Sequence, residues 1–221
     1  MKRKKQNEVL DVLDYSEPIT KIYFVRHGQT KANKEGLLIG QWDIPLNDTG
    51  KQQAKNAGLI LKNKTEIKKI DCIIASPLIR TMQTAKSISQ ITGVKKIITN
   101  NDIMERDEGD WEKKSYWEVR DTDPKKYYKW LSDPFNIRPP KGESVADLKK
   151  RVLKFEKYVL NNFKGKNIIV VSHSGPIRMF LLNILECALE KYWFLKVENG
   201  SVSEVHLSKT HKLIWAMNRM Y

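Results

Sequence analysis

The chain has 221 residues, and none of its apolar runs reaches the roughly 20 residues that a membrane-spanning helix needs. Its 40 lysine and arginine residues against 26 aspartate and glutamate residues give a net charge of +14, which attracts anionic ligands. The lysines are scattered, so this charge indicates a nucleic-acid partner only weakly. Two cysteines supply neither a disulfide framework nor a metal cluster.

The N-terminal segment is basic and polar. It begins Met-Lys-Arg-Lys-Lys, but Glu8, Asp11 and Asp14 stand where a signal peptide has its apolar core. We therefore expect a cytoplasmic protein with an N-terminal extension over residues 1–18 and a single domain over residues 19–221.

Strand-like and helix-like patterns alternate along the rest of the chain. Apolar, β-branched runs predict strands at residues 22–25, 70–75, 95–99 and 167–171. Amphipathic or apolar patterns predict helices at residues 48–62, 77–91, 116–130, 143–163 and 176–185. Residues 202–207 and 213–217 predict a closing hairpin. This order predicts an α/β fold, a three-layer α/β/α sandwich with a mostly parallel central sheet.

Three further predictions concern the segments that connect the strands and helices. Residues 29–46, with Gly36, Gly40 and Pro45, are expected to form a loop. Ser76 is expected to cap the helix that follows the second strand. Residues 100–142 are expected to form a cap-like insertion of loops and a helix.

Side chains that bind or attack phosphate follow three of the predicted strands. They are Arg26, His27, Arg80 and His173. The carboxyl ends of parallel strands share one edge of a sheet, so we expect these four side chains to lie together. Guanidinium groups grip phosphoryl oxygens bidentately, and an imidazole can attack or donate to them. The sequence therefore predicts a phosphate pocket at this edge.

Further motifs accompany these four residues over residues 20–207. They are Arg26-His27-Gly28-Gln29-Thr30 with Asn33, Asp43-Ile44-Pro45-Leu46, Gly50 with Gln53-Ala54, Ser76-Pro77-Leu78 with Arg80, Thr84-Ala85, Glu105 with Gly109 and Trp111-Glu112, Gly142-Glu143-Ser144, and Val171-Ser172-His173. Together they resemble the histidine phosphatase superfamily, and more narrowly its phosphoglycerate mutase-like branch. Two positions depart from the common pattern, because Lys113 and Ser174 stand where glycine is frequent in that family.

The resemblance implies a phosphomonoester hydrolase that works through a phosphohistidine on His27. An imidazole attacks only when it is neutral, and the positive charges of Arg26 and Arg80 oppose its protonation. These two arginines and His173 would stabilise charge on the phosphoryl group.

Glu105 would be the acid that protonates the leaving group, with Glu108 and Glu112 as the alternatives in the same acidic stretch. Two arginines and two histidines can neutralise a phosphate without a divalent cation, so we expect no metal and no cofactor. The other residues that the resemblance implies around the phosphoryl group are Gln29, Thr30, Asn33 and Ser174.

Other functions stay open at this point. The segment between Glu105 and His173 is short, which resembles the broad-specificity phosphatases more than the glycolytic mutases of the branch. Phosphoglycerate mutase-type phosphoryl transfer is the alternative activity. A non-catalytic protein that binds a phospho-ligand or nucleic acid is less favoured. We expect a small phosphorylated substrate and no membrane, and the chain is compatible with a homodimer.

The substrate itself is not specified by these residues. The aromatic side chains expected at the pocket are Trp42, Trp111, Trp117, Tyr127 and Tyr128. Trp117 and Trp130 are favoured as packing residues instead.

Overall fold

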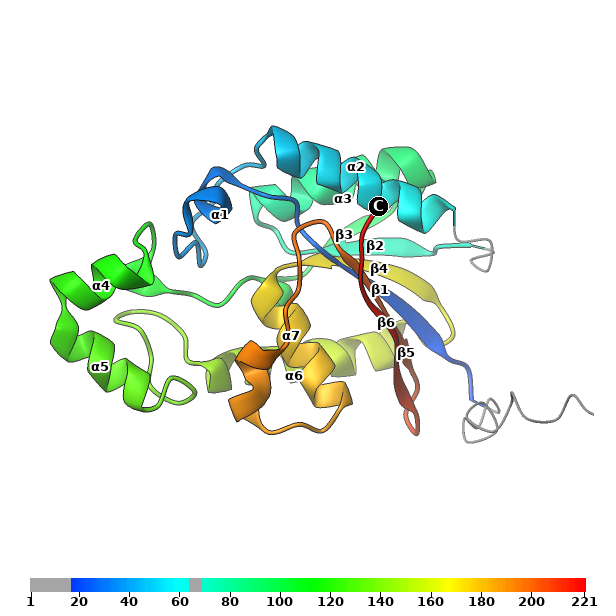
Figure 1. Ribbon diagram of the computed structural model, residues 1–221. Coiled ribbons are helices and arrows are strands. Elements are labelled where there is room, and N and C mark those ends of the chain that lie inside the picture. Colours follow the sequence, from blue (N-terminus) through cyan, green and yellow to red (C-terminus); the bar gives the residue numbers. More distant parts are fainter. Residues whose placement is uncertain (1–16, 64–68) are drawn as a thin grey trace, which may run out of the picture.

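A six-stranded sheet forms the middle layer of the computed structural model, which describes residues 17–63 and 69–221 (Figure 1). Its strands, in chain order, are β1 (Thr20–Arg26), β2 (Cys72–Ala75), β3 (Ile97–Thr99), β4 (Asn167–Ser172), β5 (Val202–Leu207) and β6 (Lys212–Arg219). Their order across the sheet is β3-β2-β4-β1-β5-β6. The first four in this order run parallel, and β5 and β6 pair antiparallel at one edge. The predicted mostly parallel sheet is confirmed.

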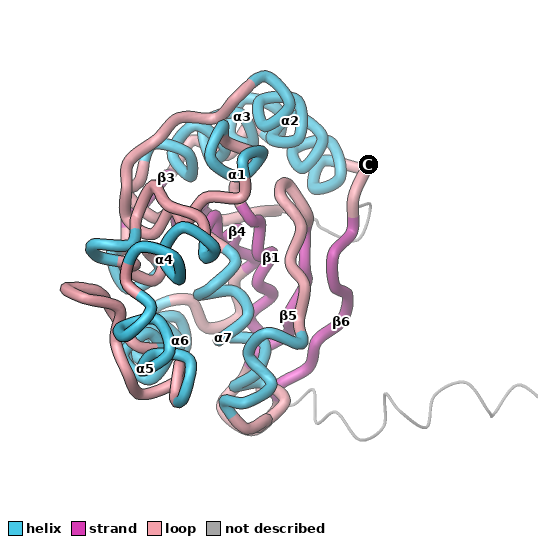
Figure 2. The backbone as a smooth tube through the Cα atoms, turned by 60° about the vertical axis from the view of Figure 1, so that its left-hand side comes forward, coloured by secondary structure: helices cyan, strands magenta, loops and turns pink. Residues whose placement is uncertain are grey.

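Helices cover both faces of the sheet, α2 (Asp48–Lys62) and α3 (Ile79–Thr92) on one side, and α6 (Val145–Asn162) and α7 (Ser174–Ile184) on the other (Figures 1 and 2). Successive side chains of a strand point to opposite faces. Ile22 and Phe24 accordingly pack in the core under α6 and α7, whereas Tyr23 and Val25 pack in the core under α2 and α3. The three-layer α/β/α prediction is confirmed.

An insertion beside the sheet connects β3 to α6 (Figure 1). It contains the 3₁₀ turns η1 (Asn101–Ile103) and η2 (Gly109–Trp111) and the helices α4 (Tyr116–Thr122) and α5 (Pro124–Ser132). The single helix predicted over residues 116–130 is wrong. Proline has no backbone N–H and its ring clashes with the preceding turn, so Pro124 ends α4. Asp123 then caps α5, its side chain accepting a hydrogen bond from the Lys126 N–H at 3.2 Å.

Several other boundaries differ from the sequence predictions. The expected loop at residues 29–46 contains a short helix, α1 (Lys31–Glu35), which Thr30 and Asn33 begin with a capping box. Leu78 is the N-cap of α3, so the capping role predicted for Ser76 is wrong. A further 3₁₀ helix, η3 (Leu189–Phe194), follows α7 and has no counterpart in the predicted elements.

Of the predicted N-terminal extension, residues 1–16 lie outside the described residues. Within residues 17–63 and 69–221, every helix is too short or too polar to cross a membrane.

Candidate active site

The parallel strands bring the two histidines of the sequence motifs side by side. Arg26 at the end of β1 pairs in register with Ser172 at the end of β4, and His27 and His173 directly follow these residues. The two imidazole rings lie with their centroids 5.0 Å apart. The register of two neighbouring strands therefore fixes the spacing of the two histidines.

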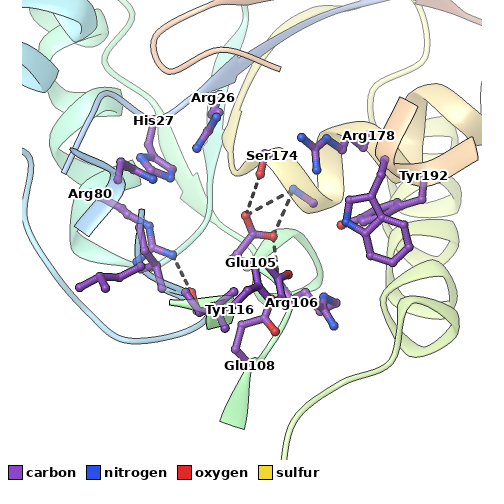
Figure 3. Close-up of a pocket in the computed structure, with 17 residues that line it drawn as sticks. Arg26, His27, Arg80, Glu105, Arg106, Glu108, Tyr116, Ser174, Arg178 and Tyr192 are labelled. Atoms are coloured by element: carbon purple, nitrogen blue, oxygen red, sulfur yellow. Dashed lines mark hydrogen bonds and ion pairs between the residues drawn. The ribbon is translucent and has the colours of Figure 1, made fainter. Parts of the chain in front are cut away.

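A cavity of about 190 Å³ opens at this edge of the sheet (Figure 3). The predicted site residues that line it are Arg26, His27, Asn33, Arg80, Glu105 and Ser174. Three others do not line it, namely Gln29, Thr30 and His173. Gln29 accepts a hydrogen bond from the Asn47 amide at 2.9 Å, and Thr30 caps α1. The substrate-binding roles of Gln29 and Thr30 stay predictions.

The loop after β1 lies directly on the first turn of α2. A Cβ atom on Gly28 would lie 2.1 Å from the carbonyl oxygen of Gly50, and one on Gly50 would lie 2.0 Å from the carbonyl oxygen of Gln29. Such distances are far shorter than a van der Waals contact, so only glycine fits at both positions. This backbone contact holds the segment that carries His27.

His27 is neutral and presents one free ring nitrogen. Its Nδ1 lies 2.7 Å from the Gly28 carbonyl oxygen, which can only accept, so Nδ1 carries the proton. Nε2 therefore keeps its lone pair. Burial, with the nearby charges of Arg80 and Arg26, lowers the pKa of His27 well below the ordinary value of 6.5. A neutral imidazole with an unprotonated nitrogen is what nucleophilic attack requires.

Arg80 is a completely buried cation whose hydrogen-bond partners are all neutral. It donates to the carbonyl oxygens of Gly40 at 2.7 Å and Trp42 at 2.9 Å, and to Nδ1 of His173 at 3.2 Å. Among the described residues, no carboxylate lies within ion-pair distance of it. Burial lowers the pKa of Arg80 to about 10. A buried charge without a counter-ion is costly, and a bound anion would offset that cost.

Arg26 contributes a second guanidinium group to the same cavity. Its Nη1 donates to the Val197 carbonyl oxygen at 2.6 Å, while its buried Nε has no partner among the described residues. Burial lowers the pKa of Arg26 to about 10. An unsatisfied buried donor in the wall of a cavity is available to donate to a ligand or to water.

His173 lies behind Arg80 rather than in the cavity wall. Because its Nδ1 accepts from Arg80, its proton is on Nε2, which lies 2.9 Å from the hydroxyl oxygen of Ser76. Burial, followed by the charge of Arg80, lowers the pKa of His173 well below 6.5. Arg80 thus fixes the tautomer of His173, and the Ser76 hydroxyl oxygen accepts the proton of Nε2. The predicted direct contact of His173 with a phosphoryl group stays a prediction.

Glu105 places its carboxyl group in the cavity, held by the first turn of α7. That helix begins earlier than predicted, at Ser174, so the Gly175 N–H has no partner within the helix and donates to Glu105 Oε1 at 3.1 Å. The Ser174 hydroxyl lies 3.4 Å from Oε2 (Figure 3). The backbone is fixed as well, because Arg151 donates to the Glu105 carbonyl oxygen at 2.9 Å.

The two alternative acids are held in other ways. Glu108 is buried at the cavity wall in an ion pair with Arg106, with 2.5 Å between the charged atoms. Burial raises the pKa of Glu108 to about 7, although Arg106 opposes this shift. Glu112 does not line the cavity and accepts a hydrogen bond from the Gln41 N–H at 2.6 Å. Geometry favours Glu105 over both. Unlike Glu112 it lines the cavity, and unlike Glu108 its carboxyl group contacts no cationic side chain at ion-pair distance in the described chain.

The aromatic wall of the cavity differs from the one expected. None of the five aromatic residues expected there lines it. Trp111 and Trp130 are buried together in the core of the insertion, which confirms the packing role expected for Trp130. The packing role expected for Trp117 is wrong, because this side chain is 68% exposed. Tyr116, Tyr192 and Trp193 line the cavity instead. The last two belong to η3, a six-residue 3₁₀ helix that has no amphipathic period to reveal it.

Two arginines of the wall, Arg106 and Arg178, were not predicted from the sequence as site residues. Fold and cavity together define an α/β protein with a cavity lined by cationic side chains at the carboxyl ends of its parallel strands. Residues 22–219 match the family model of the histidine phosphatase superfamily (branch 1).

Named relatives agree with this match. The chain is 30% identical over 200 residues to phosphoserine phosphatase 1 of Hydrogenobacter thermophilus, which covers 90% of this chain and 92% of that protein. It is 27% identical over 198 residues to the adenosylcobalamin/alpha-ribazole phosphatase of Salmonella typhimurium, over 90% and 96% of the two chains. The crystal structure of the alpha-ribazole phosphatase from Shigella flexneri superimposes with a TM-score of 0.81 at 24% identity, over 90% and 96% of the two chains.

The chain belongs to the histidine phosphatase superfamily. The resemblance inferred from the motifs is thereby confirmed, and so is the predicted class of enzyme, a hydrolytic phosphatase.

Proposed function

We propose that this protein hydrolyses small phosphate monoesters through a phosphohistidine formed on Nε2 of His27. One observation carries the proposal. A neutral imidazole with a free nitrogen faces a cavity in which two guanidinium groups, that of the partly buried Arg26 and that of the buried Arg80, have no carboxylate partner within ion-pair distance among the described residues. A phosphoryl group would supply the missing negative charge beside the attacking atom.

The first step forms the phosphoenzyme. The lone pair of His27 Nε2 forms a bond to phosphorus while the bond from phosphorus to the ester oxygen breaks, and Glu105 gives its proton to the departing oxygen. Arg26 and Arg80 neutralise the charge on the three equatorial phosphoryl oxygens. His173 acts through Arg80, whose Nε it holds, so we assign it the role of a positioning residue.

The second step releases phosphate. A water molecule attacks phosphorus, the bond from phosphorus to Nε2 breaks, and the Glu105 carboxylate takes the proton of the water. The electron pair of the broken bond returns to Nε2, which leaves His27 neutral, the form that its burial favours.

Rapid quenching of the reaction tests this mechanism. With p-nitrophenyl phosphate, we expect a phosphoenzyme that is labile in acid and stable in base, as a phosphohistidine is. The phosphoryl group should then appear as inorganic phosphate. With a phosphoglycerate as substrate, transfer of the phosphoryl group to a second position of that molecule, without release of phosphate, would instead identify a mutase.

Hydrolysis should not need a divalent metal ion. The charge that a metal would supply in phosphoryl transfer is already supplied by two arginines in the cavity wall. We expect the kcat for p-nitrophenyl phosphate to stay within about twofold after dialysis against excess EDTA. Loss of activity that magnesium restores would show that the two arginines are not sufficient.

We further propose, as the sequence predicts, a cytoplasmic location, a cap-like role of residues 100–142, a homodimer, and no nucleic-acid partner.

A further inference from the structure

We propose that Arg178 binds a second anionic group of the substrate, a carboxylate a few bonds from the phosphate ester, so that the preferred substrates are small phosphorylated carboxylic acids. This inference rests on the proposed function and adds the substrate class. Arg178 lines the cavity and lies one helical turn after Ser174 on α7, so both side chains face the same way.

The guanidinium group of Arg178 is held in place and left without an acceptor. It lies 5.8 Å from the centre of the Tyr192 ring, at the distance of a cation–π contact. Among the described residues, its buried Nε has no hydrogen-bond partner and no carboxylate pairs with it. A cation that is oriented but unpartnered in a cavity wall is arranged to receive an anion.

When a phosphate monoester is bound, Arg178 is the one charged residue in the described wall of the cavity whose charge is not neutralised. The charged residues of the wall are Arg26, Arg80, Glu105, Arg106, Glu108 and Arg178. Arg106 and Glu108 neutralise each other in their ion pair. Arg26 and Arg80 match the two negative charges of a phosphate monoester, and Glu105 is neutral when it holds the proton that it donates. One positive charge, that of Arg178, remains for another part of the substrate.

The direction of attack places that part of the substrate near Arg178. In an in-line displacement the leaving oxygen departs on the side opposite the attacking nitrogen, which here is the side of Glu105. Figure 3 shows Glu105 between His27 and Arg80 on one side and Arg178 and Tyr192 on the other. The alcohol part of the substrate therefore extends toward Arg178. Since the whole cavity measures about 190 Å³, below the roughly 300 Å³ at which pockets for drug-sized ligands begin, this alcohol is small.

Two matched pairs of esters test the inference. 3-Phosphoglycerate and glycerol 3-phosphate differ in a carboxylate against a hydroxymethyl group, and O-phosphoserine and phosphoethanolamine differ in the presence of the carboxylate. We expect the wild-type enzyme to favour the carboxylate member of each pair in kcat/KM by about 10- to 100-fold, the range of a charged hydrogen bond. In Arg178→Met this ratio should fall to near one, and Arg178→Lys should restore part of it. Arg219→Met, which removes an exposed arginine that does not line the cavity, should leave the ratio unchanged.

The affinity of the His27→Ala protein for the two members of each pair, measured by isothermal titration calorimetry, gives the corresponding preference without turnover. Equal affinity of this protein for the two members of each pair would overturn the inference, and so would an equal loss for both members in Arg178→Met. The two proposals fail in different ways. Absence of both hydrolysis and phosphoenzyme in the wild type would refute the proposed function, whereas normal hydrolysis with an unchanged ratio in Arg178→Met would refute only the role of Arg178.

Discussion

His27→Ala should lower the kcat for p-nitrophenyl phosphate by about 10⁴-fold or more, the scale on which enzymes lose activity with their nucleophile. The alanine side chain offers no lone pair to phosphorus, so no phosphoenzyme should be trapped. The fold should survive, because His27 follows β1 and is not part of either apolar core of the sheet. Stopped-flow absorbance at saturating substrate and a thermal unfolding curve measure the two effects.

His211→Ala is the matched control. This histidine lies at the hairpin between β5 and β6 and does not line the cavity, so its removal should leave kcat within about twofold, as is usual for surface substitutions. A His27→Ala protein that unfolds at the wild-type temperature and still turns over at the wild-type rate would exclude His27 as the nucleophile.

Glu105→Gln should slow hydrolysis by about 10²- to 10⁴-fold, but only for esters whose alcohol leaves poorly without a proton. Glycerol 3-phosphate is such an ester, whereas p-nitrophenolate departs readily as the anion. The substitution should therefore lower kcat/KM much more for glycerol 3-phosphate than for p-nitrophenyl phosphate. A plot of kcat/KM against the pKa of the leaving alcohol should be steeper for the variant than for the wild type.

Glu108→Gln and Glu112→Gln are the controls for this defect. Glu108 is a serious rival, because burial raises its pKa to about 7, in the range where a general acid is most effective. Its carboxylate is nevertheless engaged by Arg106, so we expect a small effect that does not depend on the leaving group. If Glu108→Gln shows the selective defect and Glu105→Gln does not, the acid must be reassigned to Glu108.

The positions of the catalytic candidates could be predicted because they follow from strand topology. Residues after β1 and β4 must meet when these strands run parallel, and the register that pairs Arg26 with Ser172 is what brings His27 beside His173. The hydrophobic patterns predict the strands, and their alternation with helices predicts that they run parallel, whereas the register is known only from the structure. The sequence could not show that His173 faces Arg80 and Ser76, because that depends on side-chain packing behind the sheet edge.

The outer wall of the cavity could not be predicted for a different reason. Tyr192 comes from a short 3₁₀ helix, and Arg178 is one arginine in an apolar helix whose orientation only the packed structure reveals. The assignment of the general acid among Glu105, Glu108 and Glu112 also depends on which carboxyl group accepts from the Gly175 N–H in the first turn of α7. Spacing along an acidic stretch carries no such information.

Because Arg80 has no counter-ion among the described residues, the thermal stability of this protein should depend on the concentration of a bound anion. An oxyanion that binds only the folded state raises the free energy of unfolding by RT ln(1 + [L]/Kd), which is about 2.7 kcal/mol at a ligand concentration of 100 Kd. Because the unliganded state leaves a wholly buried cation without a carboxylate partner among the described residues, inorganic phosphate or vanadate should raise the melting temperature. The fraction of molecules that unfold and are exposed to proteolysis would thus fall as the concentration of phosphate, the product of the reaction, rises.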